Sequence, residues 1–172
     1  VDTGFAIIAY GKLGGIELSY ASDLDLVFIY DAEPRGSTDG ERCIDNATFY
    51  TRLGQRIIHI LEARMTFGQL YEPDMRLRPS GASGMIVSSF DAFSRYQAQD
   101  AWTWEHQALV RARPVAGDAQ LGKRFDALRR DILCRERDVP QLAVEVVRMR
   151  RRMREHAGVQ AGDDEIDLKQ GH

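Results

Sequence analysis

The pattern of hydrophobic and polar positions in the first half of the chain predicts β-strands joined by turns. The apolar run FAIIAY (5–10) predicts a buried strand, and the glycine-rich GKLGG (11–15) predicts a turn directly after it. The alternating segment LDLVFIYD (24–31) predicts a second strand. We expect QLYEPDMRLR (69–78) and MIVSS (85–89) to form a hairpin across the intervening glycines.

Helical spacing of apolar residues dominates the rest of the chain. One helix is expected to start at Asp45 or Asn46, either of which suits an N-cap, and to run to about Arg64. Further helices are expected at about 90–98, 101–112, 119–135 and 139–156. Strands with a single helix, followed by a helical half, indicate the α+β fold class.

Composition narrows the classes of function. The chain has 172 residues, 44% hydrophobic and 28% charged, as is typical of a soluble globular protein. Its net charge of −3 favours neither nucleic acid nor an anionic membrane as a partner. Cys43 and Cys134 fit no metal spacing and are expected to be reduced thiols, so the cytoplasm is the expected compartment. Because the chain starts at Val1 and stops at DLKQGH, we interpret it as an excised piece of a longer protein.

Two aspartates, Asp23 and Asp25, lie at the start of the second predicted strand. Residues i and i+2 of a strand point to the same side, so the two carboxylates are expected about 7 Å apart. Like charges that close repel unless a cation lies between them, and Mg²⁺ prefers carboxylate oxygens. With a glycine turn upstream, the pair suggests a metal-dependent nucleotidyl-transfer site. The structural alternative is that one aspartate caps a turn while the other pairs with a lysine or arginine.

A third acid, Asp74, is followed by Arg76 and Arg78 at alternate positions of the predicted strand 69–78. The three side chains are therefore expected on one face of that strand. Arginines there could hold a triphosphate through bidentate contacts. The alternative is a surface ion pair between Asp74 and one of the two arginines.

The segment WTWEHQALVRAR (102–113) has both a structural and a functional interpretation. We expect its aromatic residues in the core and Glu105 in an ion pair with Arg111 or Arg113. The alternative is that this segment shapes a nucleotide pocket.

The arginine-rich run RMRRRMRE (148–155) is expected to be a solvated helical face. Glu145, Glu155 and the acidic residues DDE (163–165) would balance its charge. The alternative is a surface that binds phosphate or a partner protein.

Four segments, taken in order, resemble the glutamine synthetase adenylyltransferase family, bifunctional bacterial enzymes that add and remove adenylyl groups in nitrogen control. They are YGKLGGIELSYASDLDLVFIYD (10–31), FYTRLGQRIIHIL (49–61), YEPDMRLRPSGASGMIVSS (71–89) and AWTWEHQALVRARPVAGD (101–118). The last two segments are similar to the C-terminal, adenylyl-transferring half of that family.

The resemblance implies a nucleotidyltransferase domain of the DNA polymerase β type, a small mixed sheet with helices, over residues 1–115. It implies the start of a truncated C-terminal helical region over 116–172. In that superfamily a glycine turn precedes an Asp-x-Asp strand, and a neighbouring strand supplies a third carboxylate. The implied catalytic and metal-binding residues are Asp23, Asp25 and Asp74. The implied nucleotide-binding residues are Gly14, Gly15, Lys12, Ser22, Arg76 and Arg78.

The reaction implied by the resemblance is in-line transfer of AMP from ATP to a tyrosine of glutamine synthetase, with pyrophosphate as the leaving group. Two Mg²⁺ ions would bridge the triphosphate and the nucleophile. Asp74 would complete the nucleophile-side metal and help to deprotonate the tyrosine. A nitrogen-signalling regulatory trimer is the implied regulator of the full-length protein. The alternatives are the adenylyl-removing, phosphorolytic half of the same enzyme and a catalytically silent nucleotide-sensing module.

Overall fold

The computed structural model describes residues 4–156 except 21, 34, 65, 67 and 70, with side chains through Arg152. The chain divides into two compact units, Val1–Arg135 and Glu136–His172. The expected domain division after residue 115 stays a prediction. By its contacts, however, the helix that follows this point lies in the same compact unit as the sheet.

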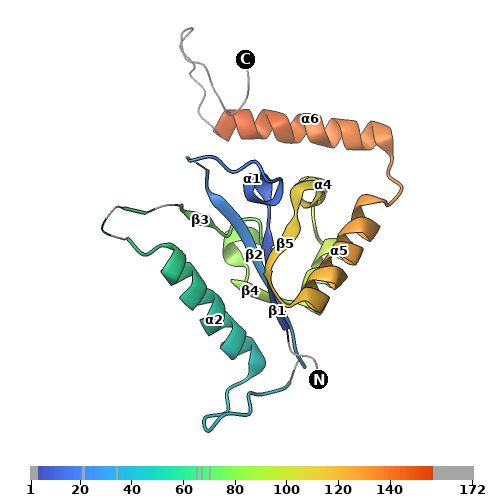
Figure 1. The fold of residues 1–172 in the computed structure, drawn as a ribbon. Helices are drawn as coiled ribbons and strands as arrows, with labels where there is room; N and C mark the ends of the chain where they lie inside the picture. The colour runs from blue at the N-terminus through green and yellow to red at the C-terminus, as the bar shows by residue number, and fades with distance from the viewer. Residues whose placement is uncertain are drawn as a thin grey trace. The chain divides into compact units, whose positions relative to one another are not determined.

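A mixed sheet forms the centre of the first unit (Figure 1). Its strands are β1 (Gly4–Ala9), β2 (Leu24–Asp31), β3 (Pro73–Asp74), β4 (Val87–Ser89) and β5 (Arg113–Gly117). Their order is β3-β2-β1-β5, and β4 pairs with β2 farther along that strand. β1 is antiparallel to β2 and β5, whereas β3 and β4 are parallel to β2. The predicted α+β class with a small mixed sheet is therefore confirmed.

The predicted hairpin between residues 69–78 and 85–89 is wrong. Among the described residues of the first segment, only Pro73 and Asp74 form a strand, and β3 and β4 both pair with β2 instead of with each other. Strand β5 was not predicted at all. It is an edge strand with Pro114 as its second residue, and proline, which has no N–H to donate, is tolerated at a sheet edge.

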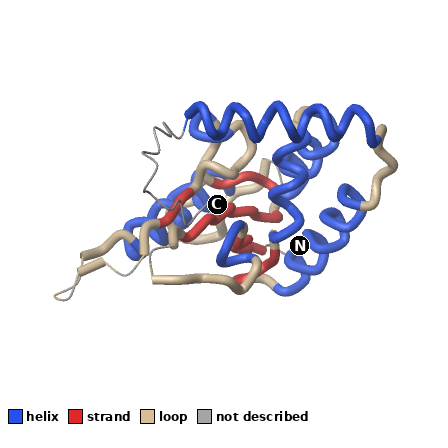
Figure 2. Tube along the Cα trace, turned by 90° about the horizontal axis from the view of Figure 1, so that it is seen from above, coloured by secondary structure: helices blue, strands red, loops and turns tan. Residues whose placement is uncertain are grey.

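Helices cover both faces of the sheet (Figures 1 and 2). The described helices of this unit are α1 (Gly11–Gly14), α2 (Asn46–Leu61), α3 (Phe90–Gln99), α4 (Thr103–Ala108) and α5 (Ala119–Leu133), with short 3₁₀ helices η1 (Gly81–Ser83) and η2 (Leu109–Arg111). Helix α2 packs on one face, while α3 and α5 pack on the other. The helices predicted from spacing are confirmed, including the N-cap of α2 at Asp45.

Alternation along the central strands produces these two layers. Val27 and Ile29 of β2 are fully buried on one side, in a cluster with Phe93 of α3 and Phe125 of α5. The intervening Phe28 belongs to the other cluster, which includes residues of α2. Because successive strand residues point to opposite faces, each layer receives every second apolar residue of β2.

The second unit contains α6 (Val139–His156). Arg148 and Arg150 are exposed, as expected for a solvated face, and the alternative of a binding surface stays open. The side chain of Glu155 and the acidic residues 163–165 lie outside the described part of the chain. Among the helices that are described, none combines the length and apolar character needed to cross a membrane.

Candidate functional site

The glycine segment after β1 forms α1, a single helical turn, where the sequence predicted an irregular turn. Gly11 opens it with φ of 52°, a backbone conformation that favours glycine. A Cβ atom placed on Gly11 would overlap Oδ2 of Asp25, so the Asp25 carboxylate lies directly against the start of α1. The glycine turn and the acidic strand are thus in contact.

Sheet pairing brings Asp25 beside Asp74, which is 49 positions later in the sequence. The two residues are register partners in the parallel pairing of β2 with β3. Parallel neighbours lie about 4.8 Å apart and point to the same side, so these two carboxylates share one end of the sheet. Asp25 is half-buried, whereas Asp23, just before β2, is exposed.

One guanidinium group, that of Arg76, offsets the negative charge of these acids. Its Nη2 donates to Oδ2 of Asp74 at 2.5 Å and its Nε donates to Oδ1 at 3.0 Å. The hydrogen bonds from Arg76 lower the pKa of the Asp74 carboxyl. The pKa of Arg76 is raised, chiefly by Asp74 and in smaller part by Asp23 and Asp25. The ion pair that the sequence left as an alternative is therefore present.

The expectation that Asp74, Arg76 and Arg78 share one strand face is wrong, because β3 ends at Asp74. Arg78 instead holds the following loop together. Its guanidinium donates to three backbone carbonyls, those of Met75 at 2.7 Å, Ala82 at 3.0 Å and Gly84 at 3.2 Å. Arg78 thus shapes the loop after β3, and its predicted contact with phosphate stays a prediction.

The remaining predicted nucleotide-binding residues lie around α1 and the loop before β2. Ser22 is buried, and its hydroxyl oxygen accepts the backbone N–H of Ser19 at 3.1 Å, so it fixes this loop. Lys12 is exposed on α1. The N–H groups of Gly14 and Gly15 donate to the carbonyls of Tyr10 and Gly11, at 2.8 and 3.0 Å. The N–H groups of the two glycines are therefore already used within α1. What the glycines offer a phosphate is a close approach to the backbone.

The donor chemistry of this site fits a magnesium ion, because carboxylate oxygens are the ligands that Mg²⁺ prefers. In the part of the chain that the structure describes, however, no three His, Cys, Asp or Glu side chains are gathered closely enough to enclose a metal. Such an ion would thus take its other ligands from water and phosphate, as Mg²⁺ commonly does.

The predicted ion pair between Glu105 and Arg111 or Arg113 is wrong. Glu105 accepts a hydrogen bond from the Tyr96 hydroxyl at 3.0 Å, and burial raises its pKa. Arg111 pairs with Glu17 at 2.8 Å. Arg113 donates to backbone carbonyls at the end of α1. Sequence spacing gave no signal for the contacts of Arg113, because they join residues 99 and 100 positions apart.

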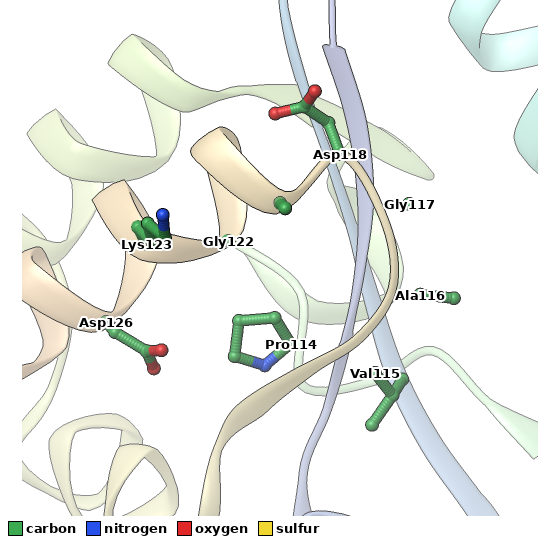
Figure 3. Close-up of a pocket in the computed structure, with 9 residues that line it drawn as sticks. Pro114, Val115, Ala116, Gly117, Asp118, Gly122, Lys123 and Asp126 are labelled. Atoms are coloured by element: carbon green, nitrogen blue, oxygen red, sulfur yellow. The ribbon is translucent and has the colours of Figure 1, made fainter.

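A hollow of about 290 Å³ lies at the opposite edge of the sheet, between β5 and the start of α5 (Figure 3). Figure 3 shows Asp126 projecting from α5 toward Pro114 of β5. The acidic residues described above are not among its lining residues. This hollow is therefore separate from the candidate site.

Replacing Arg76 with Met should raise the pKa of Asp74 toward the ordinary value of an aspartate. The lowered pKa in the folded chain means that the pair stabilises the fold above the ordinary pKa, and that this stabilisation is lost as the pH falls through the lowered value. An acid titration of the Asp74 carboxyl by NMR measures the change. Arg130→Met, which removes an exposed arginine of α5, is the control. An unchanged Asp74 titration in the Arg76 variant would assign the effect to another group.

Comparison with known proteins identifies the family. The family model for glutamate-ammonia ligase adenylyltransferase matches residues 1–128. A protein of Pseudomonas syringae pv. tomato is 59% identical over 157 residues, which is 91% of this chain and 16% of the relative. One of Methylococcus capsulatus is 59% identical over 169 residues, 98% of this chain and 18% of the relative. Both are named bifunctional glutamine synthetase adenylyltransferase/adenylyl-removing enzyme.

The chain thus spans less than one fifth of the length of these relatives. The match nevertheless covers the sheet, the glycine turn and all three acids of the candidate site. The chain belongs to the glutamate-ammonia ligase adenylyltransferase family.

Proposed function

We propose that this chain is a nucleotidyltransferase domain whose parent protein moves AMP from ATP to a tyrosine of glutamine synthetase. The names of the relatives support the reaction and the protein substrate. The structural observation that carries the proposal is the register pairing of Asp25 with Asp74 beside the glycine turn. This arrangement places carboxylates next to backbone that phosphate can approach closely.

Asp23 and Asp25 are the residues that would hold Mg²⁺, which when bound supplies positive charge to the triphosphate. The Asp25 carboxylate lies directly against Gly11 and is half-buried, whereas Asp23 is exposed. Arg76 has 78% of its side chain exposed and can therefore reach an arriving triphosphate. Ser22 and Arg78 act indirectly, by holding the loops before β2 and after β3.

Transfer joins the tyrosine oxygen to the α-phosphorus of ATP as the bond to pyrophosphate breaks, and the proton of the tyrosine hydroxyl passes to water. The lowered pKa of Asp74 makes it a weak proton acceptor. We therefore propose that the negative charge of Asp74 helps to orient the groups around the attacking tyrosine, and that Asp74 does not remove the tyrosine proton. Arg76 connects Asp74 with the Asp23–Asp25 pair, because it donates a hydrogen bond to Asp74 and interacts electrostatically with Asp23 and Asp25.

The direction of reaction that we favour is addition of AMP. Ser80 and Gly81 are small residues in left-handed backbone conformations, with φ of 61° and 56°, in the loop that follows β3. We propose that their small side chains favour entry of ATP and departure of pyrophosphate. The second candidate is removal of AMP by phosphorolysis, and the names of the relatives include an adenylyl-removing enzyme. The cytoplasm as the compartment and control by a nitrogen-signalling trimer are further parts of this proposal.

A transfer assay tests the proposal directly. The parent protein, ATP labelled at the α-phosphate and unmodified glutamine synthetase should give labelled glutamine synthetase in the presence of Mg²⁺. In a parallel reaction, adenylylated glutamine synthetase and phosphate are supplied in place of ATP. Loss of ADP release, with forward transfer retained, when Asp23 and Asp25 of this domain are replaced with Asn in the parent protein would assign the removing activity to this domain. Absence of both reactions with intact ATP binding would indicate a nucleotide-sensing module.

Replacing Asp74 with Ala in the parent protein should lower kcat about 100-fold or more and change the KM for ATP by less than about threefold. A carboxylate that orients the nucleophile side acts mainly in the transition state, so its loss affects kcat more than substrate binding. Initial-rate kinetics of AMP transfer measure both constants. Asp91→Ala, which removes an exposed acid of α3, should leave both unchanged. An unaltered kcat in the Asp74 variant would remove this residue from the site.

A further inference from the structure

Arg113, the first residue of β5, holds the end of the glycine turn. Its half-buried guanidinium donates from Nε to the carbonyl of Gly14 at 2.9 Å and from Nη2 to the carbonyl of Leu13 at 3.1 Å. The last carbonyls of a helix accept no hydrogen bond from a following helical turn. The carbonyl of Leu13 also accepts the backbone N–H of Ile16 at 3.3 Å, whereas Arg113 binds both Leu13 and Gly14. A cation at the C-terminal end of a helix also interacts favourably with the helix dipole.

The contact between α1 and the segment leading into β5 is close. A Cβ atom on Gly14 would overlap the carbonyl oxygen of Arg111 and would lie 2.7 Å from that of Ala9. There is consequently little space for α1 to shift toward β5. Arg113 holds the same end of α1 by directional hydrogen bonds, so this end is fixed by both sterics and charge.

The other end of α1 is the part that touches the candidate site, since Gly11 lies against the Asp25 carboxylate. A helical turn of four residues is only about 6 Å long, so its two ends lie close together. A change in the position of its C-terminal carbonyls therefore moves Gly11 with respect to Asp25. Arg113 can therefore affect the position of the Asp25 carboxylate through α1, without direct contact between the two side chains.

We infer that Arg113 is a positioning residue for the nucleotide site: by holding the carbonyls of Leu13 and Gly14, it keeps α1 in the place where Gly11 orients the Asp25 carboxylate. This inference rests on the proposed function for its meaning in nucleotide binding. The contact between Arg113 and α1, in contrast, is a property of the fold. The two parts can be tested separately.

The chain contains a matched control for Arg113. Arg129 of α5 is also half-buried and also binds two consecutive backbone carbonyls through Nε and Nη2. Its acceptors are Leu109 at 2.6 Å and Val110 at 2.5 Å, in η2. Replacing either arginine with Met removes the same number and type of hydrogen bonds. Of the two arginines, only Arg113 donates hydrogen bonds directly to carbonyls of α1.

The experiment compares Arg113→Met with Arg129→Met in the 172-residue chain. Hydrogen exchange of the backbone amides of residues 11–17 measures the release of α1, and calorimetry measures the Mg²⁺-dependent affinity for ATP. We expect Arg113→Met to accelerate this exchange and to weaken ATP binding about tenfold, which corresponds to the loss of one or two charged hydrogen bonds. Arg129→Met should lower the melting temperature similarly but leave exchange and affinity within about twofold of the wild type.

Arg113→Lys, which keeps the charge and can reach one carbonyl, should lie between wild type and Arg113→Met and remains informative if the Met variant fails to fold. Equal loss of ATP affinity in the Arg113 and Arg129 variants, or no loss in either, would overturn the inference. A wild-type chain that binds no ATP would refute the proposed function instead. In that case faster exchange confined to the Arg113 variants would still support their hold on α1, and unchanged exchange would overturn it.

Discussion

Replacing both Asp23 and Asp25 with Asn should abolish Mg²⁺-dependent ATP binding while the chain remains folded. Asparagine keeps the size of the side chain, so the contact of residue 25 with Gly11 is preserved. It removes both negative charges, and a neutral amide oxygen is a much weaker ligand for Mg²⁺ than a carboxylate. The change in melting temperature should be small, because relief of repulsion between the acids is opposed by the loss of their attraction to Arg76.

The measurement is the rise in melting temperature on addition of Mg²⁺ and ATP, together with calorimetric titration. Ligand that binds only the folded state raises stability by mass action, so the rise should be present in wild type and absent in the double variant. Asp39→Asn combined with Glu41→Gln is the matched control, since both residues are exposed in the loop before α2 and the charge change is the same. If wild type shows no rise and the double variant unfolds, the acidic pair has a structural role only.

Sequence alone was sufficient to predict the strand that carries Asp25, whereas the role of the acids stays a prediction. Residues 24–31 form a mainly apolar run of one strand length, and β2 has these bounds. The position of Asp74 beside Asp25 could be expected only from the resemblance to a known family, because the pairing of β2 with β3 joins residues 49 positions apart. Local periodicity contains no information on which strand is the neighbour.

Sequence reasoning failed where a side chain binds the backbone of a turn or of a segment that is distant in the sequence. The alternation in residues 69–78 predicted a long strand, but Arg78 uses its guanidinium to close a tight loop that begins at Met75. A buried Met75 between polar neighbours is compatible with this turn as well as with a strand, so the pattern could not distinguish the two. β5 was missed for a different reason: Arg113–Gly117 is short and is paired on one side only, by β1.

The two glycines at the end of α1 should respond very differently to alanine. Gly14 is buried, and an added Cβ would overlap a backbone carbonyl of the segment before β5, which cannot move away as a side chain could. We expect Gly14→Ala to destabilise the chain by about 3 kcal/mol, the upper part of the usual range for overpacking. For a domain of this size that corresponds to a fall in melting temperature of roughly 6–12 °C.

Gly15→Ala should keep the fold and affect the candidate site alone. Gly15 has φ of −79° and ψ of −2°, a conformation that alanine adopts readily. Its added Cβ would lie 3.3 Å from the Gly11 carbonyl oxygen, a tight contact that offsets the entropic gain of replacing glycine. The melting temperature should therefore stay near that of wild type, since these effects amount to about 1 kcal/mol or less.

Thermal melts and Mg²⁺-dependent ATP titration of both variants separate the two roles of this turn. A methyl group at Gly15 occupies space beside α1 that a phosphate could otherwise approach, so ATP binding should weaken in Gly15→Ala although the fold is intact. Gly14→Ala should lose stability first, and any loss of ATP binding there would follow from the displaced turn. Wild-type stability in Gly14→Ala would show that α1 is not pressed against the chain before β5. Wild-type ATP affinity in Gly15→Ala would place the triphosphate elsewhere. Because the two positions are adjacent, a general sensitivity of the turn cannot produce opposite results at them. A large fall in melting temperature in Gly14→Ala, with loss of ATP affinity alone in Gly15→Ala, would require both the close backbone contact at Gly14 and a nucleotide bound at this turn.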